Sequence, residues 1–101
     1  MANYDYGVTA QRKDRNEVIT AINVHALSPT STGPATEWTK SQGVSTIEKG
    51  YRMCTMLWNT GSGQWNIQAN IRVVTDSNGN KYLRTDANNI ASDNLENLPS
   101  F

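Results

Sequence analysis

Cysteine and histidine, which supply much of the chemistry of protein sites, are almost absent from this chain of 101 residues. There is one of each, Cys54 and His25. A single cysteine cannot form a disulfide within the chain, which favours a cytoplasmic location. One cysteine and one histidine also cannot build a zinc site with several Cys and His ligands, although sites of Asp and Glu stay open. We expect no metal and no cofactor.

An excess of charge of one sign is also missing, because nine Lys and Arg balance nine Asp and Glu. Without a global positive field, binding to duplex nucleic acid or to an anionic membrane surface is disfavoured. No apolar run approaches the roughly 18 residues of a membrane span, and the first residues lack a basic segment followed by an apolar one. The sequence predicts a soluble protein without a secretion signal.

The length allows a single domain over residues 1–101, with a modest hydrophobic core. Three Trp and four Tyr offer more aromatic surface than one small core readily hides. The tryptophans either stack on a ligand or pack in the core or in a subunit interface; they are Trp38, Trp58 and Trp65. We therefore predict self-association to at least a dimer.

The first half of the chain predicts a β-hairpin, a loop and a helix. Strand-like runs at 4–12 and 18–27 flank a polar cluster that suits a turn. Residues 28–36 are rich in Ser, Thr, Pro and Gly, which predicts an exposed loop. A Thr-x-x-Gln cap at Thr39 and a glycine at Gly50 bracket a helix of about ten residues. The apolar face of this helix carries Val44, Ile47 and Tyr51.

The second half predicts an antiparallel meander and a final helix. The strands lie at 52–59, 64–75 and 81–86. Asp93-x-x-Glu96 matches a capping box for a short helix that faces the core with Leu95 and Leu98 and stops at Pro99. The order of elements predicts an α+β fold: a five-stranded, mainly antiparallel sheet with one central helix and a short C-terminal helix.

Loop length in the last hairpin decides which side chains share a face, because opposite residues on paired strands point the same way. A two-residue Asn78-Gly79 turn mixes apolar and polar side chains on both faces. A three-residue loop with Gly79 in the left-handed conformation instead places Leu83 opposite Val73. The predicted core face is then Trp65, Ile67, Ala69, Ile71, Val73 and Leu83.

The other face of these strands carries amides, two guanidiniums, a tyrosine and a carboxylate. Arg forms bidentate contacts with phosphate, Asn and Gln address base edges, and Tyr offers a stacking surface. Such a face predicts a pocket for a small anionic, nucleotide-like ligand, with Arg84 as its principal anion contact. The alternative is a solvated sheet face. The residues on this second face of the strands are Asn66, Gln68, Asn70, Arg72, Tyr82, Arg84 and Asp86.

The segment that follows Arg84 extends the predicted pocket. Asp, Asn and Ser bond their own backbone in turns and caps, which is the structural interpretation of residues 86–94. The N-terminus of the final helix also presents N–H groups to an anion. Calcium is disfavoured because the spacing of a calcium loop is missing. The predicted ligand-binding residues are Arg84, Arg72, Tyr82, Asp86, Asn88, Ser92, Asn94 and His25.

Catalysis has few candidate residues. His25 ends the second predicted strand, where it serves as a ligand contact, as a general base or as neither. A Cys54–His25 dyad stays open, but Cys54 suits a packed side chain within a strand. No P-loop, G-x-S-x-G, H-E-x-x-H or dinucleotide motif occurs. We expect a protein that is not an enzyme, and a small hydrolase using His25 with Asp86 is the least favoured alternative.

Residues 81–99 carry the pattern K-Y-L-R-T-D-x-N-x-x-x-S-D-N-L-x-x-L-P. It resembles the closing signature of small bacterial and phage proteins catalogued as domain of unknown function 3892, and the first hairpin and the Val-x-x-Ile-Glu-x-Gly helix are similar as well. That family has no established activity. Small phage proteins with a polar pocket and no catalytic motif resemble, as a class, sponges that sequester nucleotide signals of bacterial immunity. We expect this anti-defence function in the host cytoplasm; a protein-binding inhibitor or adaptor is the alternative.

Overall fold

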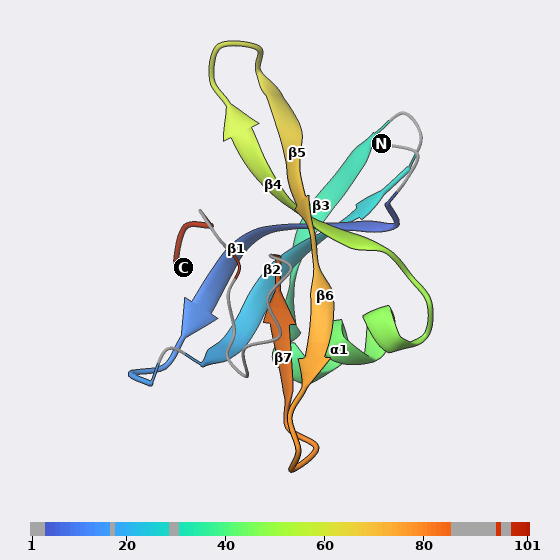
Figure 1. Ribbon diagram of the computed structural model, residues 1–101. Coiled ribbons are helices and arrows are strands. Elements are labelled where there is room, and N and C mark those ends of the chain that lie inside the picture. The colour runs from blue at the N-terminus through green and yellow to red at the C-terminus, as the bar shows by residue number, and fades with distance from the viewer. Residues whose placement is uncertain (1–3, 17, 29–30, 86–94, 96–97) are drawn as a thin grey trace.

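The computed structural model describes residues 4–16, 18–28, 31–85, 95 and 98–101 (Figure 1). Strands and one helix account for most of these residues. In chain order the elements are β1 (Tyr6–Lys13), β2 (Ile19–Leu27), β3 (Thr32–Thr39), α1 (Lys40–Glu48), β4 (Met53–Asn59), β5 (Gln64–Asn70), β6 (Arg72–Thr75) and β7 (Lys81–Arg84).

Five strands form a mixed sheet in the order β3-β2-β1-β4-β5. Three of its strand pairs are antiparallel, and β1 pairs with β4 in parallel. A parallel pair needs a crossover connection, and β2, β3 and α1 together supply it. The predicted five-stranded sheet with a central helix is therefore confirmed in outline, although it is not purely antiparallel.

The prediction of a loop over residues 28–36 is wrong for its second part, because β3 begins at Thr32 and pairs antiparallel with β2. Its position explains the misleading composition. Proline is tolerated in an edge strand because the N–H that it lacks can be one that would point away from the neighbouring strand, and Pro34 lies in such a strand. The exposed threonines also suit a strand. The strand also continues directly into the helix, since Thr39 ends β3 and caps α1.

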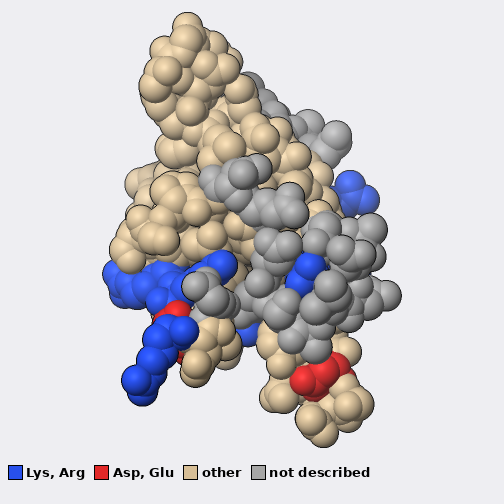
Figure 2. Space-filling model, turned by 60° about the vertical axis from the view of Figure 1, so that its left-hand side comes forward, with Lys and Arg blue, Asp and Glu red and all other residues tan. Residues whose placement is uncertain are grey.

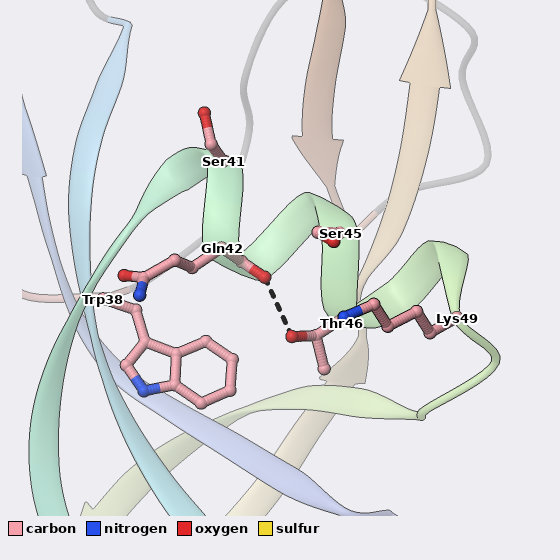
Figure 3. A pocket seen from close by; sticks show the side chains of 6 residues that line it. All are labelled: Trp38, Ser41, Gln42, Ser45, Thr46 and Lys49. Carbon is pink, nitrogen blue, oxygen red and sulfur yellow. Dashed lines mark hydrogen bonds between the residues drawn. The ribbon is translucent and has the colours of Figure 1, made fainter.

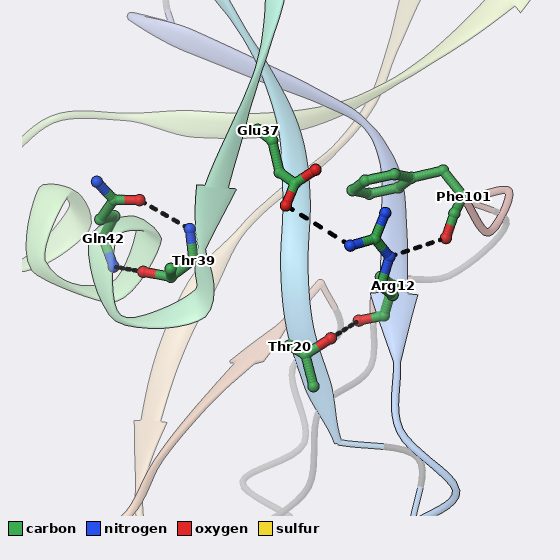
Figure 4. A network of polar contacts seen from close by, with 6 residues as sticks. All are labelled: Arg12, Thr20, Glu37, Thr39, Gln42 and Phe101. Atoms are coloured by element: carbon green, nitrogen blue, oxygen red, sulfur yellow. Dashed lines mark hydrogen bonds and ion pairs between the residues drawn. The ribbon is translucent and has the colours of Figure 1, made fainter.

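The predicted ends of α1 are confirmed. The Thr39 hydroxyl accepts the Gln42 N–H at 3.2 Å, and the Gln42 side chain accepts the Thr39 N–H at 2.8 Å, a complete capping box that is visible in Figure 4. Gly50 follows the helix with a φ of 100°, which favours glycine. Val44 is buried as predicted, whereas Tyr51 lies beyond the helix and is 49% exposed.

The predicted strand 64–75 is two strands in different sheets. Ile71 separates them; it is buried, and its N–H donates to the Met53 carbonyl at 2.9 Å. The second piece, β6, pairs with β7 as a separate two-stranded sheet, so β3 and not β7 completes the large sheet. A buried side chain and a hydrogen bond between residues distant in sequence place this break, and strand periodicity does not reveal them.

The predicted three-residue loop of the last hairpin is confirmed. Asp76 N–H donates to the Asn80 carbonyl at 2.9 Å, Gly79 has a φ of 85°, and Val73 lies opposite Leu83. The predicted core face is wrong in β5, because the pairing shifts between Thr55 and Met56 and leaves Gln68 as the extra residue of a bulge. The bulge puts Ala69 and Ile67 on opposite faces.

The core lies between the large sheet, α1 and the β6–β7 hairpin, which Figure 1 shows together in its lower half. Gly43 of α1 is closely packed there, since a Cβ at this position would lie 3.0 Å from Ile22 Cδ1. Leu95 and Leu98 are buried in the same core, as predicted. The predicted C-terminal helix otherwise falls on residues outside the described ones. The core residues are Val8, Ile19, Ile22, Val24, Val44, Met53, Ile71, Leu83, Leu95 and Leu98.

Side-chain contacts attach the end of the chain to β1. The buried Gln11 amide donates to the carbonyls of Leu95 and Leu98 at 3.2 and 3.3 Å. Figure 4 shows how Arg12 donates to the Phe101 carbonyl and pairs with Glu37 of β3 at 3.6 Å. Because both ion-pair partners are largely exposed, we attribute the attachment mainly to the buried amide and to two backbone hydrogen bonds, from the Gln11 N–H to the Pro99 carbonyl at 2.9 Å and from the Phe101 N–H to the Gln11 carbonyl at 3.1 Å.

Replacing Thr39 by Ala should lower the free energy of unfolding by about 1 kcal/mol, since the capping hydroxyl is lost. Urea unfolding followed by circular dichroism measures it. Ser45→Ala is the control, because Ser45 lies exposed within the helix, where Ala is the better helix former. Equal midpoints for Thr39→Ala and the wild type would contradict the role of the capping box.

Candidate functional site

A groove runs along the exposed side of α1, beside the end of β3. Because β3 continues into the helix without a loop, Trp38 lies at the base of the first helical turn. Residues four apart on a helix are neighbours on its surface, so two short rows of polar side chains follow. The hollow has a volume of about 360 Å³ and is lined by Trp38, Ser41, Gln42, Ser45, Thr46 and Lys49 (Figure 3).

The polar groups of this groove divide into two kinds. Gln42 Oε1 is engaged in the helix cap, and the Thr46 hydroxyl donates to the Gln42 carbonyl at 2.8 Å, as Figure 3 shows. Within the described part of the chain, no hydrogen bond or ion pair engages the side chains of Ser41, Ser45 and Lys49. The groove thus offers two hydroxyls and an ammonium to a ligand.

The Trp38 indole is held in place by neighbouring rings. The Tyr6 ring of β1 meets it edge to face, with centroids 5.0 Å apart, and meets the Tyr51 ring at 6.0 Å. Edge-to-face pairs of this kind add to the stability of aromatic packing. The indole is half-buried. It is therefore an oriented aromatic surface beside the groove.

A second hollow of about 470 Å³ lies on the other side of α1, against the turn between β6 and β7. Here the Lys81 ammonium meets the Glu48 carboxylate at 2.6 Å, and Lys40 Nζ lies 4.8 Å from the centre of the Tyr82 ring. Ser41 and Ser45 line both hollows, so the two are adjacent. The lining residues are Lys40, Ser41, Val44, Ser45, Glu48, Gly79, Asn80 and Lys81.

The structure brings together three of the predicted ligand-binding residues. Arg72 lies opposite Arg84, and Tyr82 is on the same face of the β6–β7 sheet, as the predicted register requires. Arg84 is only 3% exposed, whereas Arg72 and Tyr82 are half-buried. The Arg84 guanidinium is therefore not at the surface. The predicted ligand residues Asp86, Asn88, Ser92 and Asn94 lie outside the described residues.

The Tyr82 hydroxyl donates to Asp76 at 3.2 Å, which fixes the ring beside the hairpin turn. Asp76 also accepts the backbone N–H groups of Asn78 and Asn80, both at 2.9 Å. Partial desolvation raises the pKa of Asp76, but these hydrogen bonds outweigh it and hold the pKa below its usual range. Asp76 is therefore a turn-stabilising carboxylate.

His25 is separated from the arginines by the large sheet. It follows the core residue Val24 along β2, so its side chain lies on the opposite face. Its Nδ1–H donates to the Gly33 carbonyl at 2.8 Å, and Nε2 lies 3.0 Å from the Thr9 hydroxyl. The ring is 8% exposed and packs 5.5 Å from the Trp65 ring. With both nitrogens engaged, His25 has a structural role.

Cys54 does not form a dyad with His25. Both residues lie opposite Gly7 of β1, one on either side. The Met56 side chain covers Gly7, since a Cβ there would lie 2.3 Å from Met56 Cε. Burial raises the pKa of the Cys54 thiol to about 11, which leaves almost no thiolate at neutral pH. Cys54 is a packed side chain, as the sequence favoured.

The groove along α1 was not predicted from the sequence, where residues 39–50 indicate a capped helix that packs on the core. The available signal was the polar outer row of that helix, Ser41, Ser45 and Lys49 at intervals of four, which begins three residues after Trp38. Among the described residues, no group of three or more His, Cys, Asp or Glu lies together as metal ligands. Nor does any helix there have the length and apolar character of a membrane span.

Cys54 should resist alkylation by iodoacetamide at pH 7.5 in the folded protein and react after unfolding in urea. The reason is the low thiolate fraction of a buried thiol with a raised pKa. Mass spectrometry at successive times measures the rate. Rapid labelling of the native protein would contradict the assignment of a packed thiol.

Comparisons with known proteins identify a family. No curated protein and no solved structure matches the chain. A family model described as "Protein of unknown function (DUF3892)" matches residues 7–99, which is nearly the whole chain and includes α1 and all but the first residue of the two sheets. The chain therefore belongs to the DUF3892 family of proteins of unknown function.

Proposed function

We propose that this protein binds a small anionic, nucleotide-like ligand without transforming it, in the groove between Trp38 and α1. The single observation that carries the proposal is the arrangement of an indole, two unengaged hydroxyls and an ammonium around one hollow of about 360 Å³. Small-molecule pockets typically have volumes of about 300–1,000 Å³. The indole would stack on a base, and the Lys49 ammonium would meet a phosphate.

These contacts also set a scale for affinity. Stacking of a base on an aromatic ring contributes about 1–3 kcal/mol, and a hydrogen bond to a charged group about 1.5–3 kcal/mol. Their sum of roughly 3–6 kcal/mol corresponds to weak, about millimolar binding of one nucleotide unit. To keep a ligand from its receptor, a sequestering protein must bind it more tightly than this. Such affinity needs more contacts than one hollow provides.

The second hollow supplies those contacts in the proposal. It adjoins the first through Ser41 and Ser45, and Lys40 and Lys81 line it. Together the two hollows present three lysines against one glutamate, Glu48, which favours an anion. We therefore favour a ligand with two anionic units, such as a dinucleotide, lying across α1.

We infer binding without chemistry from the kind of groups present. The first hollow is lined by hydroxyls, an amide, an indole and an ammonium, with no histidine or carboxylate. His25 and Cys54, which sequence analysis kept as catalytic candidates, are buried on the opposite face of the large sheet. Sequestration of a nucleotide signal by a phage protein is the biological form of this proposal.

A second candidate function is that of a protein-binding inhibitor or adaptor. The observation that favours it is the exposure of Trp58 and Ile67 on the β4–β5 hairpin, at 52% and 38%. Exposed aromatic side chains are common at protein interfaces. This surface lies apart from the groove, so the two functions make separate predictions.

Lys49→Gln should remove most of the stabilisation by a nucleotide ligand, because the phosphate contact of the first hollow is lost. The measurement is the shift of the thermal unfolding midpoint against a panel of cyclic and linear mono- and dinucleotides. Arg15→Gln is the matched control, since it makes the same charge change at an exposed turn between β1 and β2.

Four outcomes decide this experiment. A shift for the wild type and for Arg15→Gln, but a much smaller one for Lys49→Gln, supports the groove. A panel without any shift contradicts nucleotide binding. Recovery of unchanged ligand after denaturation supports sequestration, whereas recovery of a product identifies an enzyme.

Arg84→Ala should destabilise the fold by more than about 1 kcal/mol, because a 3% exposed guanidinium is removed from its buried surroundings. Arg72→Ala, which alters a half-buried side chain directly opposite, should cost less. Urea unfolding of both variants measures the difference. If Arg84→Ala instead retains wild-type stability and loses nucleotide binding, Arg84 is the anion contact that the sequence predicts.

A further inference from the structure

The β4–β5 hairpin is uncharged. Between Arg52 and Arg72 the sequence contains no Lys, Arg, Asp or Glu, although eighteen such residues occur elsewhere in the chain. Figure 1 shows this hairpin projecting from the top of the molecule, and Figure 2 shows the same upper lobe without a basic or acidic side chain. Charged side chains at a surface oppose association with another chain, and this projecting segment has none.

The outer edge of the hairpin is open for pairing. β5 ends the large sheet, and among the described residues no strand pairs with its outer side. Proteins usually protect such edges with charged residues or proline. β3, at the other edge, carries Pro34 and Glu37, whereas β5 has neither kind of residue. The bulge at Gln68 limits the regular open edge to residues 64–67.

An exposed apolar patch lies beside this edge. Trp58 lies opposite Trp65, and Ile67 lies opposite Met56 two positions further along, so their side chains share one face. The rings of Trp58 and Trp65 meet edge to face at 5.2 Å, and Trp65 packs in turn on His25. The patch is thus rigidly supported although Trp58 and Ile67 stay 52% and 38% exposed. Rigid aromatic anchors of this kind are typical of protein interfaces.

We propose that this surface binds a second copy of the same chain, with the two β5 strands paired antiparallel about a twofold axis at Asn66, so that Trp65 of each strand lies opposite Ile67 of the other. Close to a twofold axis each side chain lies near its own equivalent, so a charged residue there would meet a like charge. The segment has none. Asn66, at the axis, carries both donors and an acceptor and can pair with its own copy. A second copy of this edge supplies an equally uncharged partner, which favours self-recognition.

Association through the hairpin is compatible with an open groove. In Figure 1 α1 lies low in the molecule, far from the hairpin tip, and no residue that lines either hollow belongs to β4 or β5. A dimer formed in this way would present two grooves. Dimerisation through the hairpin does not depend on any ligand. The protein could therefore bind a nucleotide as a monomer, or dimerise without binding a nucleotide.

For the wild type, sedimentation equilibrium should give a mass twice the 11.2 kDa of one chain. The measurement is made at about 50 μM, a concentration at which a dimer with a micromolar Kd is associated. Ile67→Lys should sediment as a monomer, because it places two ammonium groups in one interface. Val18→Lys is the matched control and should stay dimeric; Val18 is 37% exposed, close to the 38% of Ile67, but lies outside the hairpin.

A charge-swap experiment tests self-recognition itself. Ile67→Lys and Ile67→Glu should each be monomeric, and an equimolar mixture should recover a dimer, since opposite charges then meet across the axis. Circular dichroism confirms that each variant is folded, and Asn66→Lys with Asn66→Glu, at the axis itself, replaces a pair that is not. A monomeric wild type, a dimeric Ile67→Lys protein, or a mixture that stays monomeric overturns the proposal.

Discussion

The parallel pairing of β1 with β4 is the constraint on which the rest of the structure depends. It joins the two halves of the chain through three residue pairs, Tyr6 with Met53, Gly7 with Cys54 and Val8 with Thr55. Because parallel strands cannot be joined by a tight turn, the chain must cross the sheet between them. β3 and α1 lie on that crossover. The position of the helix, and with it both hollows, follows from this one pairing.

The same pairing explains why the two faces of the large sheet differ. One face receives α1 and the β6–β7 hairpin and forms the main core. On the other, Gly7 leaves space that Met56 fills, and the rings of Trp65 of β5 and His25 of β2 lie 5.5 Å apart. The single histidine and the single cysteine are packed there. The residue types best known for catalysis are thus packed on this second face, and the ligand that we propose binds instead at the polar surface of α1.

Binding and self-association use separate parts of the fold in our proposals. The groove depends on the outer row of α1 and on an indole held by Tyr6, all close to the crossover. The hairpin depends on an open edge and on the absence of charge. A small domain gains stability from association when its own core is modest. Two sites on opposite parts of a small protein allow both without competition.

The sequence by itself determined the features that local chemistry controls: the Thr39 cap, the left-handed glycines at 50 and 79, the three-residue loop and the shared face of Arg72, Tyr82 and Arg84. It also predicted most strands. Only the tertiary structure decided the edge strand β3, the break at Ile71, the bulge at Gln68 and the burial of Arg84. Each of these depends on how strands and side chains pack against one another in the folded chain, and strand propensity changes with such surroundings.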